Sequence, residues 1–143
     1  NQEQSQMMGA FLWGKKADTK LLKSDLTENQ DSLLAECVWQ NGNKHSRSFC
    51  FNKADKLVIE DDMATTSDSY ATLVLHPACQ VKVENGKAVI QRGAITVCIE
   101  TNIEPTIEKC WYSEEYGKEN ETHKLCYPLN DNKLKTTIWI EKY

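Results

Sequence analysis

The chain has 143 residues, 40% of them hydrophobic and 27% charged, and its formal net charge is −4. This length fits one domain with its own core, and the composition is too apolar for a disordered chain. The acidic balance argues against broad binding of nucleic acid, which needs clustered Lys and Arg, and no apolar run approaches the roughly 20 residues of a membrane span. We therefore expect one soluble domain over residues 1–143.

The first third of the chain gives weak signals. Residues 1–10 are polar and are expected to form a frayed N-terminus, although the apolar residues between Met7 and Trp13 also suit a short strand at a sheet edge. Residues 18–31 are expected to form a short helix or a long loop, because Leu21, Leu22 and Leu26 have helical spacing. An edge strand around these leucines is the alternative.

A hairpin is predicted where residues 33–39 and 47–51 read as two strands joined through Asn41-Gly42. A two-residue turn would place Glu36 opposite Arg47, whereas a four-residue loop would place Cys37 opposite Cys50. The turn residues favour the first register and disulfide geometry favours the second, so the sequence leaves both open.

Two further strands are expected on either side of a polar loop. Residues 56–60 form the first, residues 60–69 form the loop, and residues 70–76 form the second strand, which Pro77 ends.

The clearest signal lies between Cys79 and Cys98. Asn85-Gly86 is the dipeptide that best tolerates a type I′ turn, and it predicts a hairpin in which Glu84 faces Lys87, Val83 faces Ala88 and Val81 faces Ile90. Gly93 interrupts the chain before a third strand, which carries Ile95, Val97 and Ile99.

The C-terminal third predicts one more hairpin and a last strand. Residues 108–112 and 123–127 look like its arms, and pairing about Gly117-Lys118 would place Cys110 opposite Cys126. Residues 134–140 alternate as a final strand. Nine or ten short strands with little helix predict an all-β protein, with an antiparallel β-sandwich favoured over an up-and-down barrel.

The cysteine count suggests a disulfide-stabilised domain. None of the six cysteines belongs to a Cys-x-x-Cys pair or has a histidine at zinc-ligand spacing, so three disulfides in a secreted, extracellular protein are expected, with Cys110 to Cys126 the preferred bridge. Asn120-Glu121-Thr122 is a glycosylation acceptor and agrees with that compartment. The cysteines are Cys37, Cys50, Cys79, Cys98, Cys110 and Cys126.

Catalytic and cofactor motifs are absent from the sequence. His45, His76 and His123 lie in no recognisable motif and are expected at the surface, and no cofactor is predicted. Glu60-Asp61-Asp62 with Asp68 is the best cation candidate, but its spacing fits no calcium loop, and no metal is predicted.

The stretch from Cys110 to Asn120 is the candidate binding surface. It combines aromatic side chains with acidic ones, a composition suited to a basic partner. The predicted ligand-binding residues are Trp111, Tyr112, Glu114, Glu115 and Tyr116.

These features predict a secreted, non-enzymatic protein that binds an extracellular protein ligand, such as a basic cytokine or chemokine. A lipocalin-like barrel that carries a small hydrophobic ligand is the alternative, since four tryptophans could line a cavity. Residues 9–14 match the Gly-x-Trp opening of lipocalins poorly, and no family is assigned. A small secreted hydrolase that uses the histidines is the third possibility.

Overall fold

The computed structural model describes residues 5–9, 12–65, 68–129 and 131–141. These residues form strands, turns and loops without a helix, so none of them forms a helix that could span a membrane. The prediction of an all-β protein with antiparallel sheets is confirmed.

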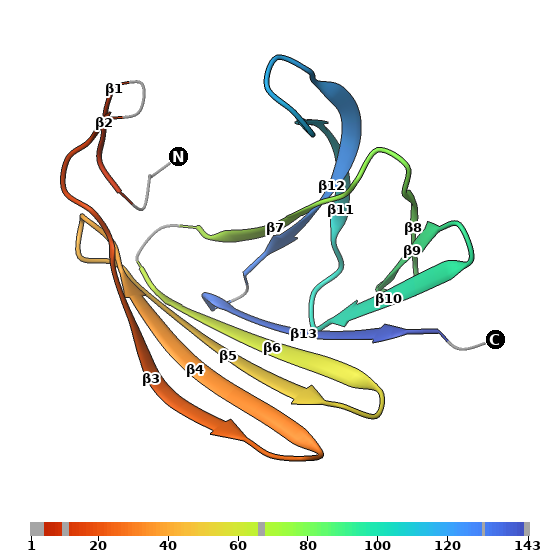
Figure 1. Cartoon of the computed structure of the whole chain (residues 1–143), viewed down its shortest axis with the longest axis horizontal. Helices are drawn as coiled ribbons and strands as arrows, with labels where there is room; N and C mark the ends of the chain where they lie inside the picture. The colour runs from red at the N-terminus through yellow and green to blue at the C-terminus, as the bar shows by residue number, and fades with distance from the viewer. Residues whose placement is uncertain (1–4, 10–11, 66–67, 130, 142–143) are drawn as a thin grey trace.

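One large sheet holds eight of the strands, in the order β3-β4-β5-β6-β13-β10-β9-β8, and every neighbouring pair is antiparallel. Figure 1 shows this sheet curving along the lower part of the molecule and rising on the right. Its strands are β3 (Asp18–Leu26), β4 (Gln30–Val38), β5 (Lys44–Asn52), β6 (Lys56–Ala64), β8 (Gln80–Glu84), β9 (Lys87–Arg92), β10 (Ile95–Thr101) and β13 (Lys133–Ile140).

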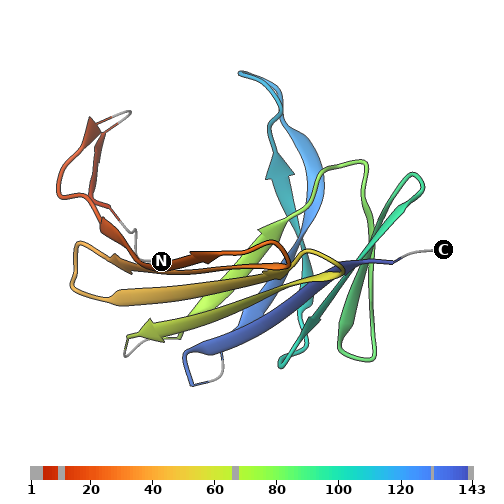
Figure 2. The same ribbon diagram turned by 60° about the horizontal axis from the view of Figure 1, so that its bottom comes forward.

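Two smaller sheets complete the fold. The three-stranded sheet has the order β11-β12-β7, and the two-stranded sheet pairs β1 with β2. Figures 1 and 2 show the β11–β12 hairpin and the β1–β2 sheet rising from the same side of the large sheet. Their strands are β1 (Met7–Gly9), β2 (Leu12–Trp13), β7 (Tyr70–Val74), β11 (Thr106–Tyr112) and β12 (Asn120–Pro128).

The buried core lies between the large sheet and the three-stranded sheet. Leu125 of β12 is completely buried, as is Ala88 of β9, and Ile99 of β10 is 3% exposed. Burying each large aliphatic side chain contributes about 1.5–3 kcal/mol, so this contact is what holds the two sheets together. We call the face of the large sheet that points to this core the inner face, and the opposite one the outer face.

The turn at Asn85-Gly86 forms as predicted. Asn85 and Gly86 have φ angles of 53° and 75°, the left-handed values that a type I′ turn requires. Glu84 pairs with Lys87, and the rest of the predicted ladder follows, with β10 added beside β9.

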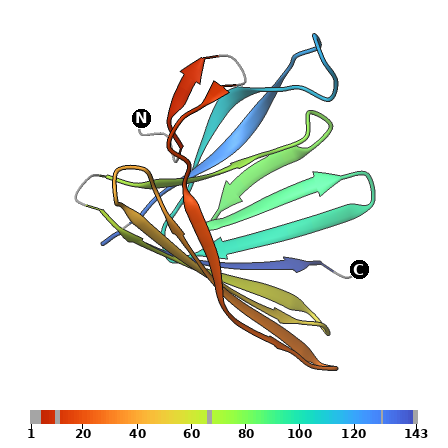
Figure 3. The same ribbon diagram turned by 60° about the vertical axis from the view of Figure 1, so that its left-hand side comes forward.

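The first two predictions along the chain need correction. Met7–Gly9 is a strand rather than part of a frayed terminus, while residues 1–4 and 10–11 lie outside the described residues. The segment expected as a helix or loop forms the alternative, an edge strand, which is β3 (Figure 3). A bulge between Leu21 and Lys23 interrupts it. The bulge explains the helical spacing, because an extra residue in a strand breaks the two-residue alternation of its side chains.

The hairpin of β4 and β5 differs in register from both predicted alternatives. β4 and β5 pair Cys37 with His45, because the connection spans residues 39–43, with Trp39 N–H donating to the Asn43 carbonyl. β6 also continues to Ala64, through residues that were expected to form a loop.

The prediction of disulfide bridges is wrong in this structure. Cys110 lies opposite Thr122 and Cys126 lies opposite Thr106, so the two cysteines are four residues out of register. The tip between β11 and β12 spans residues 113–119 and is centred on Tyr116 rather than on Gly117-Lys118, which sets this register. All six cysteines are free: Cys37, Cys50, Cys79, Cys98, Cys110 and Cys126.

Candidate functional site

On the inner face, a buried carboxylate of β6 contacts two basic side chains of the neighbouring strand β5. His45 Nε2 and Arg47 Nε both lie 2.6 Å from Asp61 Oδ1. His45 and Arg47 share a face because they are two residues apart in β5, and β6 brings Asp61 directly opposite Arg47. We call these three residues the inner-face cluster.

The strand pairing of β6 shows which face of the large sheet the cluster occupies. Leu57 of β6 pairs across with Ile138, which pairs with the buried Ile99. Asp61 lies four residues after Leu57 in the same strand, so it points to the same side as this core row. Asp61 therefore occupies a position that alternation reserves for an apolar side chain.

Two opposing effects set the pKa of Asp61. Burial raises the pKa, since only 4% of the side chain is exposed, but the hydrogen bonds and charges of His45 and Arg47 outweigh burial and lower the pKa from its ordinary value of 3.8. The carboxylate is therefore ionised at neutral pH and supplies a fixed negative charge beneath the two basic groups.

Arg47 is held in place but remains accessible. Its Nε is bonded to Asp61, its guanidinium carbon lies 5.9 Å from the centre of the Phe49 ring, and 41% of the side chain is exposed. Among the described residues no hydrogen bond is made by its terminal Nη atoms. A guanidinium fixed at one edge and open at the other is suited to bind a carboxylate or sulfate group.

His45 is more enclosed, with 19% of its side chain exposed. When the ring is neutral and Nε2 carries the proton, that N–H donates to Asp61, and Nδ1 becomes the free acceptor. An aspartate orients a catalytic histidine by the same contact, so the geometry would suit His45 to accept a proton at Nδ1.

The acidic residues beside Asp61 do not form a cation site. Glu60 and Asp62 point to the outer face, where they pair with Lys135 at 2.9 Å and Lys133 at 3.3 Å. Within the described ranges no group of three His, Cys, Asp or Glu residues is placed to hold a metal ion.

The five predicted ligand-binding residues lie on and beside the tip of the β11–β12 hairpin. Trp111 is 65% exposed, Tyr116 is fully exposed, and Glu115 pairs with Lys118. Glu114 Oε1 lies 2.7 Å from His76 Nε2, and the ring of Tyr112 lies 5.3 Å from the ring of His76. That these five residues bind a ligand stays a prediction.

The histidines differ from the expectation of plain surface residues. His76 Nδ1 accepts a hydrogen bond from the Ala78 N–H, so its ring connects the loop after β7 to Glu114 at the hairpin. His123 alone among the three is exposed and makes no recorded side-chain contact in the described part of the chain. Sequence reasoning names Arg47 only in a strand register and Asp61 only in a cation candidate, and it misses their contact, although the spacing of His45 and Arg47 in a strand places both on one face.

Comparison with known families gives one match over nearly the whole chain. The family model described as Heparinase II/III-like, C-terminal, matches residues 1–141. A search of curated proteins finds no match.

Solved structures of heparinases share the fold. A heparan sulfate lyase, HepC from Pedobacter heparinus, is 15% identical with a TM-score of 0.73, and the match covers 90% of this chain and 22% of that one. A heparinase III gene product is 17% identical with a TM-score of 0.71, covering 88% of this chain and 22% of that one. A structure of heparinase III is 16% identical with a TM-score of 0.67, covering 88% and 21%. The chain thus spans about a fifth of the length of these proteins.

These findings correct the predicted function. A non-enzymatic binder of a basic protein such as a cytokine or chemokine is wrong, because the family match points to a carbohydrate-active domain of the polysaccharide lyase type. The lipocalin-like carrier and the small hydrolase have no support in this match. The match likewise gives no support for secretion or for a glycan on Asn120.

Proposed function

Because the chain belongs to the Heparinase II/III-like, C-terminal family, we propose that it is a β-sheet part of a polysaccharide lyase that acts on an acidic polysaccharide. The fold shared with a heparan sulfate lyase supports a substrate of the glycosaminoglycan class. We also propose that the eight-stranded and three-stranded sheets form the two layers of a β-sandwich within one domain, since both contribute to the buried core.

One observation carries the proposal: the guanidinium of Arg47 is anchored on a buried carboxylate and keeps an open edge on the inner face. Acidic polysaccharides carry carboxylate or sulfate groups on every repeat, and Arg recognises such groups through paired N–H donors. The carboxylate of Asp61 compensates the positive charge of Arg47, so the guanidinium stays in place when the substrate is absent.

The inner-face cluster also fits the chemistry of a lyase. In this reaction a base removes the proton from the carbon beside the uronate carboxyl group, the bond to the glycosidic oxygen on the next carbon breaks, and a carbon–carbon double bond forms. The departing oxygen takes up a proton. Arg47 would neutralise the carboxylate and so stabilise the charge that develops, while His45 Nδ1 would take the proton.

The hairpin tip stays a second proposed contact for the same substrate. The exposed rings of Trp111 and Tyr116 offer flat apolar surfaces to sugar rings. Glu114 and Glu115 would repel a polyanion, so we expect the two rings and Tyr112 to matter more than the two acids.

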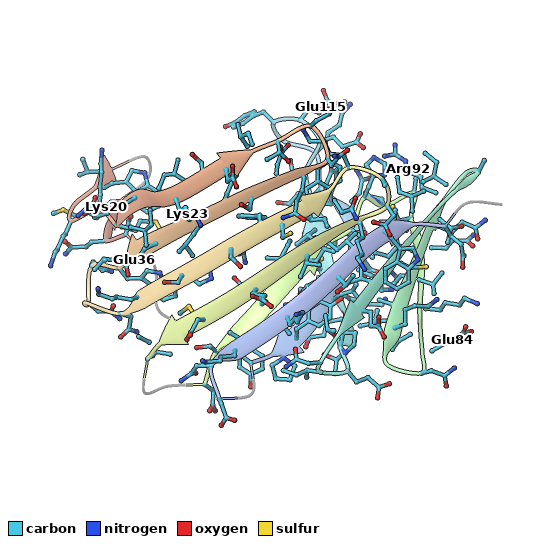
Figure 4. All side chains as sticks on the ribbon, turned by 90° about the horizontal axis from the view of Figure 1, so that it is seen from below. Lys20, Lys23, Glu36, Glu84, Arg92 and Glu115 are labelled. Carbon is cyan, nitrogen blue, oxygen red and sulfur yellow. The ribbon has the colours of Figure 1, made fainter. Side chains whose placement is uncertain are left out.

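Binding of a heparan sulfate tetrasaccharide, measured by calorimetry at low salt, tests the proposal. Arg47→Ala is expected to weaken binding by about tenfold or more, since it removes a charged hydrogen-bonding group. Arg92→Ala is the matched control, because Arg92 is the other arginine of the chain and lies at the opposite end of the large sheet from Lys20 and Lys23 (Figure 4).

The outcomes separate the site from general electrostatics. Equal weakening by Arg47→Ala and Arg92→Ala would show that any positive charge serves, and the assignment of Arg47 would be wrong. Thermal melting of each variant shows whether it is folded. Cleavage is followed by the ultraviolet absorbance of the new double bond, and His45→Gln is expected to abolish that signal while His123→Gln leaves it unchanged.

A further inference from the structure

The outer face of the large sheet carries a groove that the proposed lyase chemistry does not use. It has a volume of about 380 Å³, within the range of about 300–1,000 Å³ typical of ligand sites. It crosses the middle of strands β4, β5 and β6 and the start of β13, on the face seen in Figure 4. The inner-face cluster lies on the other side of the same strands.

The groove is hollowed where β5 carries small side chains at two positions that are adjacent on its outer face. Ser46 lies opposite Asp62 and Ser48 lies opposite Glu60, and both serines point to the outer face with these acids. In the described part of the chain neither serine hydroxyl has a recorded hydrogen-bond partner. Two half-buried hydroxyls thus face the groove, each able to donate and to accept a hydrogen bond.

The walls alternate in charge. Glu60 pairs with Lys135 and Asp62 pairs with Lys133, with about half or more of each side chain exposed. On the outer face these two acids and two bases cancel. Asp61 also lines the groove, but its charge is paired with Arg47 on the inner face, so the groove has no unpaired charge to attract a polyanion or a polycation.

Asn102 and Leu34 also line the groove, as do Asp61 and Leu134, whose side chains point to the inner face. The Oδ1 atom of Asn102 accepts the backbone N–H of Lys135, which leaves the amide N–H₂ group free to donate, and Leu34 adds an apolar contact. Hydroxyls, an amide, balanced charges and one apolar side chain are complementary to a molecule rich in hydroxyl groups that carries no charge.

We infer that this outer-face groove is a second saccharide site, which binds an uncharged sugar rather than the acidic substrate of the inner face. Its position on the opposite face lets both sites be occupied at once. A site of this kind would hold the protein on an uncharged polysaccharide that lies beside the anionic substrate. The inference does not depend on the assignment of Arg47 or His45.

Two-dimensional NMR of the labelled chain, titrated with cellotriose and tri-N-acetylchitotriose as uncharged probes and a heparin tetrasaccharide as the charged one, tests the inference. At least one uncharged probe is expected to shift the backbone amide signals of Ser46, Ser48, Lys133 and Lys135. Shifts of these signals by the heparin tetrasaccharide alone, or by no probe, would overturn it.

Substitutions identify the groups that bind. The double variant Ser46→Ala/Ser48→Ala is expected to weaken binding of the uncharged probe by about tenfold, because it removes two hydrogen-bonding hydroxyls. Ser24→Ala, in edge strand β3, is the control and is expected to bind as the unmodified chain does. Equal affinities of the two variants would contradict the inference.

A second pair of variants covers the case in which the double serine variant fails to fold. Lys135→Met breaks the Glu60 pair in the groove, and Lys82→Met breaks a pair with Glu84 of nearly equal exposure in edge strand β8. Only Lys135→Met should weaken binding, by about threefold or more. Arg47→Ala should leave binding of the uncharged probe unchanged, which separates failure of this site from failure of the proposed lyase site.

Discussion

Asp61 Oδ1 and Arg47 Nε lie 2.6 Å apart across neighbouring strands, with 4% of the acid side chain exposed and 41% of the arginine side chain exposed. The acid therefore depends on its partner more than the arginine does, because water can solvate Arg47 but hardly reaches Asp61. This asymmetry governs the effects of substituting either residue.

Asp61→Asn is expected to lower the free energy of unfolding by about 2 kcal/mol, since it removes the charge that His45 and Arg47 surround. The next residue gives a matched control. Asp62 is exposed on the outer face, so Asp62→Asn should change stability by less than about 0.5 kcal/mol. Urea denaturation of both variants measures the difference, and equal effects would show that the inner-face cluster is not a stabilising unit.

The lowered pKa of Asp61 predicts how this contribution depends on pH. The folded state binds the proton more weakly than the unfolded state, whose carboxyl titrates near the ordinary value of 3.8. The stabilisation is therefore complete above that value and is lost as the pH falls below it, through the lower pKa of the folded state. The difference in stability between the unmodified chain and Asp61→Asn should therefore be constant near neutral pH and shrink as the pH falls below 3.8. A difference that stays constant below that pH would contradict the assigned direction.

Replacing the buried Tyr127 by phenylalanine, which lacks the hydroxyl, is expected to raise the stability of the protein. Tyr127 is 4% exposed, and its hydroxyl has no hydrogen-bond partner among the described residues. Tyr127→Phe removes this unpaired buried group and is expected to be neutral or to stabilise the protein by up to about 1 kcal/mol. Tyr70→Phe, at an exposed position, should have no effect. A clear loss of stability for Tyr127→Phe would mean that the hydroxyl is paired.

The same residue predicts a change at alkaline pH. Burial raises the pKa of Tyr127 to about 12, above its ordinary value of 10.0. The unfolded chain loses this proton first, so stability should fall as the pH rises from 10.0 towards about 12. Ultraviolet titration of tyrosinate measures the pKa, and Tyr127→Phe should lack this part of the loss.

Gly86→Ala tests the turn between β8 and β9. Gly86 has a φ of 75°, and a Cβ atom there would meet nothing within 4 Å, so only backbone strain opposes the change. The cost is expected to be about 1 kcal/mol. Gly9→Ala also meets no atom within 4 Å but lacks the positive φ, and it should cost less. Thermal melting compares the two, and equal shifts would show that the turn tolerates a side chain.

The sequence predicts structure well where one residue pair decides the geometry. Asn85-Gly86 sets the turn, and the register of β8 against β9 follows from it. The β11–β12 tip has no such pair, because several seven-residue loops fit the same residues and each would give a different register. The assumed turn at Gly117-Lys118 then brought the two cysteines together in the prediction but not in the structure.

The inner-face cluster shows a different limit. His45 and Arg47 share a strand, and their spacing alone places them on one side. Asp61 was assigned to a polar loop because it lies between two other acids, and a run of acids does not reveal that only the middle one points inward. The register of β5 and β6 determines that contact, and it depends on the whole sheet.

The bulge in β3 has a consequence for how molecules meet one another. All nine residues of this edge strand are exposed, including Leu21 and Leu26. A strand from a second molecule that hydrogen-bonds to the half before the bulge would be out of step with the half after it, and Lys20 and Lys23 place like charges along the edge. We therefore expect growth of the sheet from one molecule to the next to be disfavoured at β3.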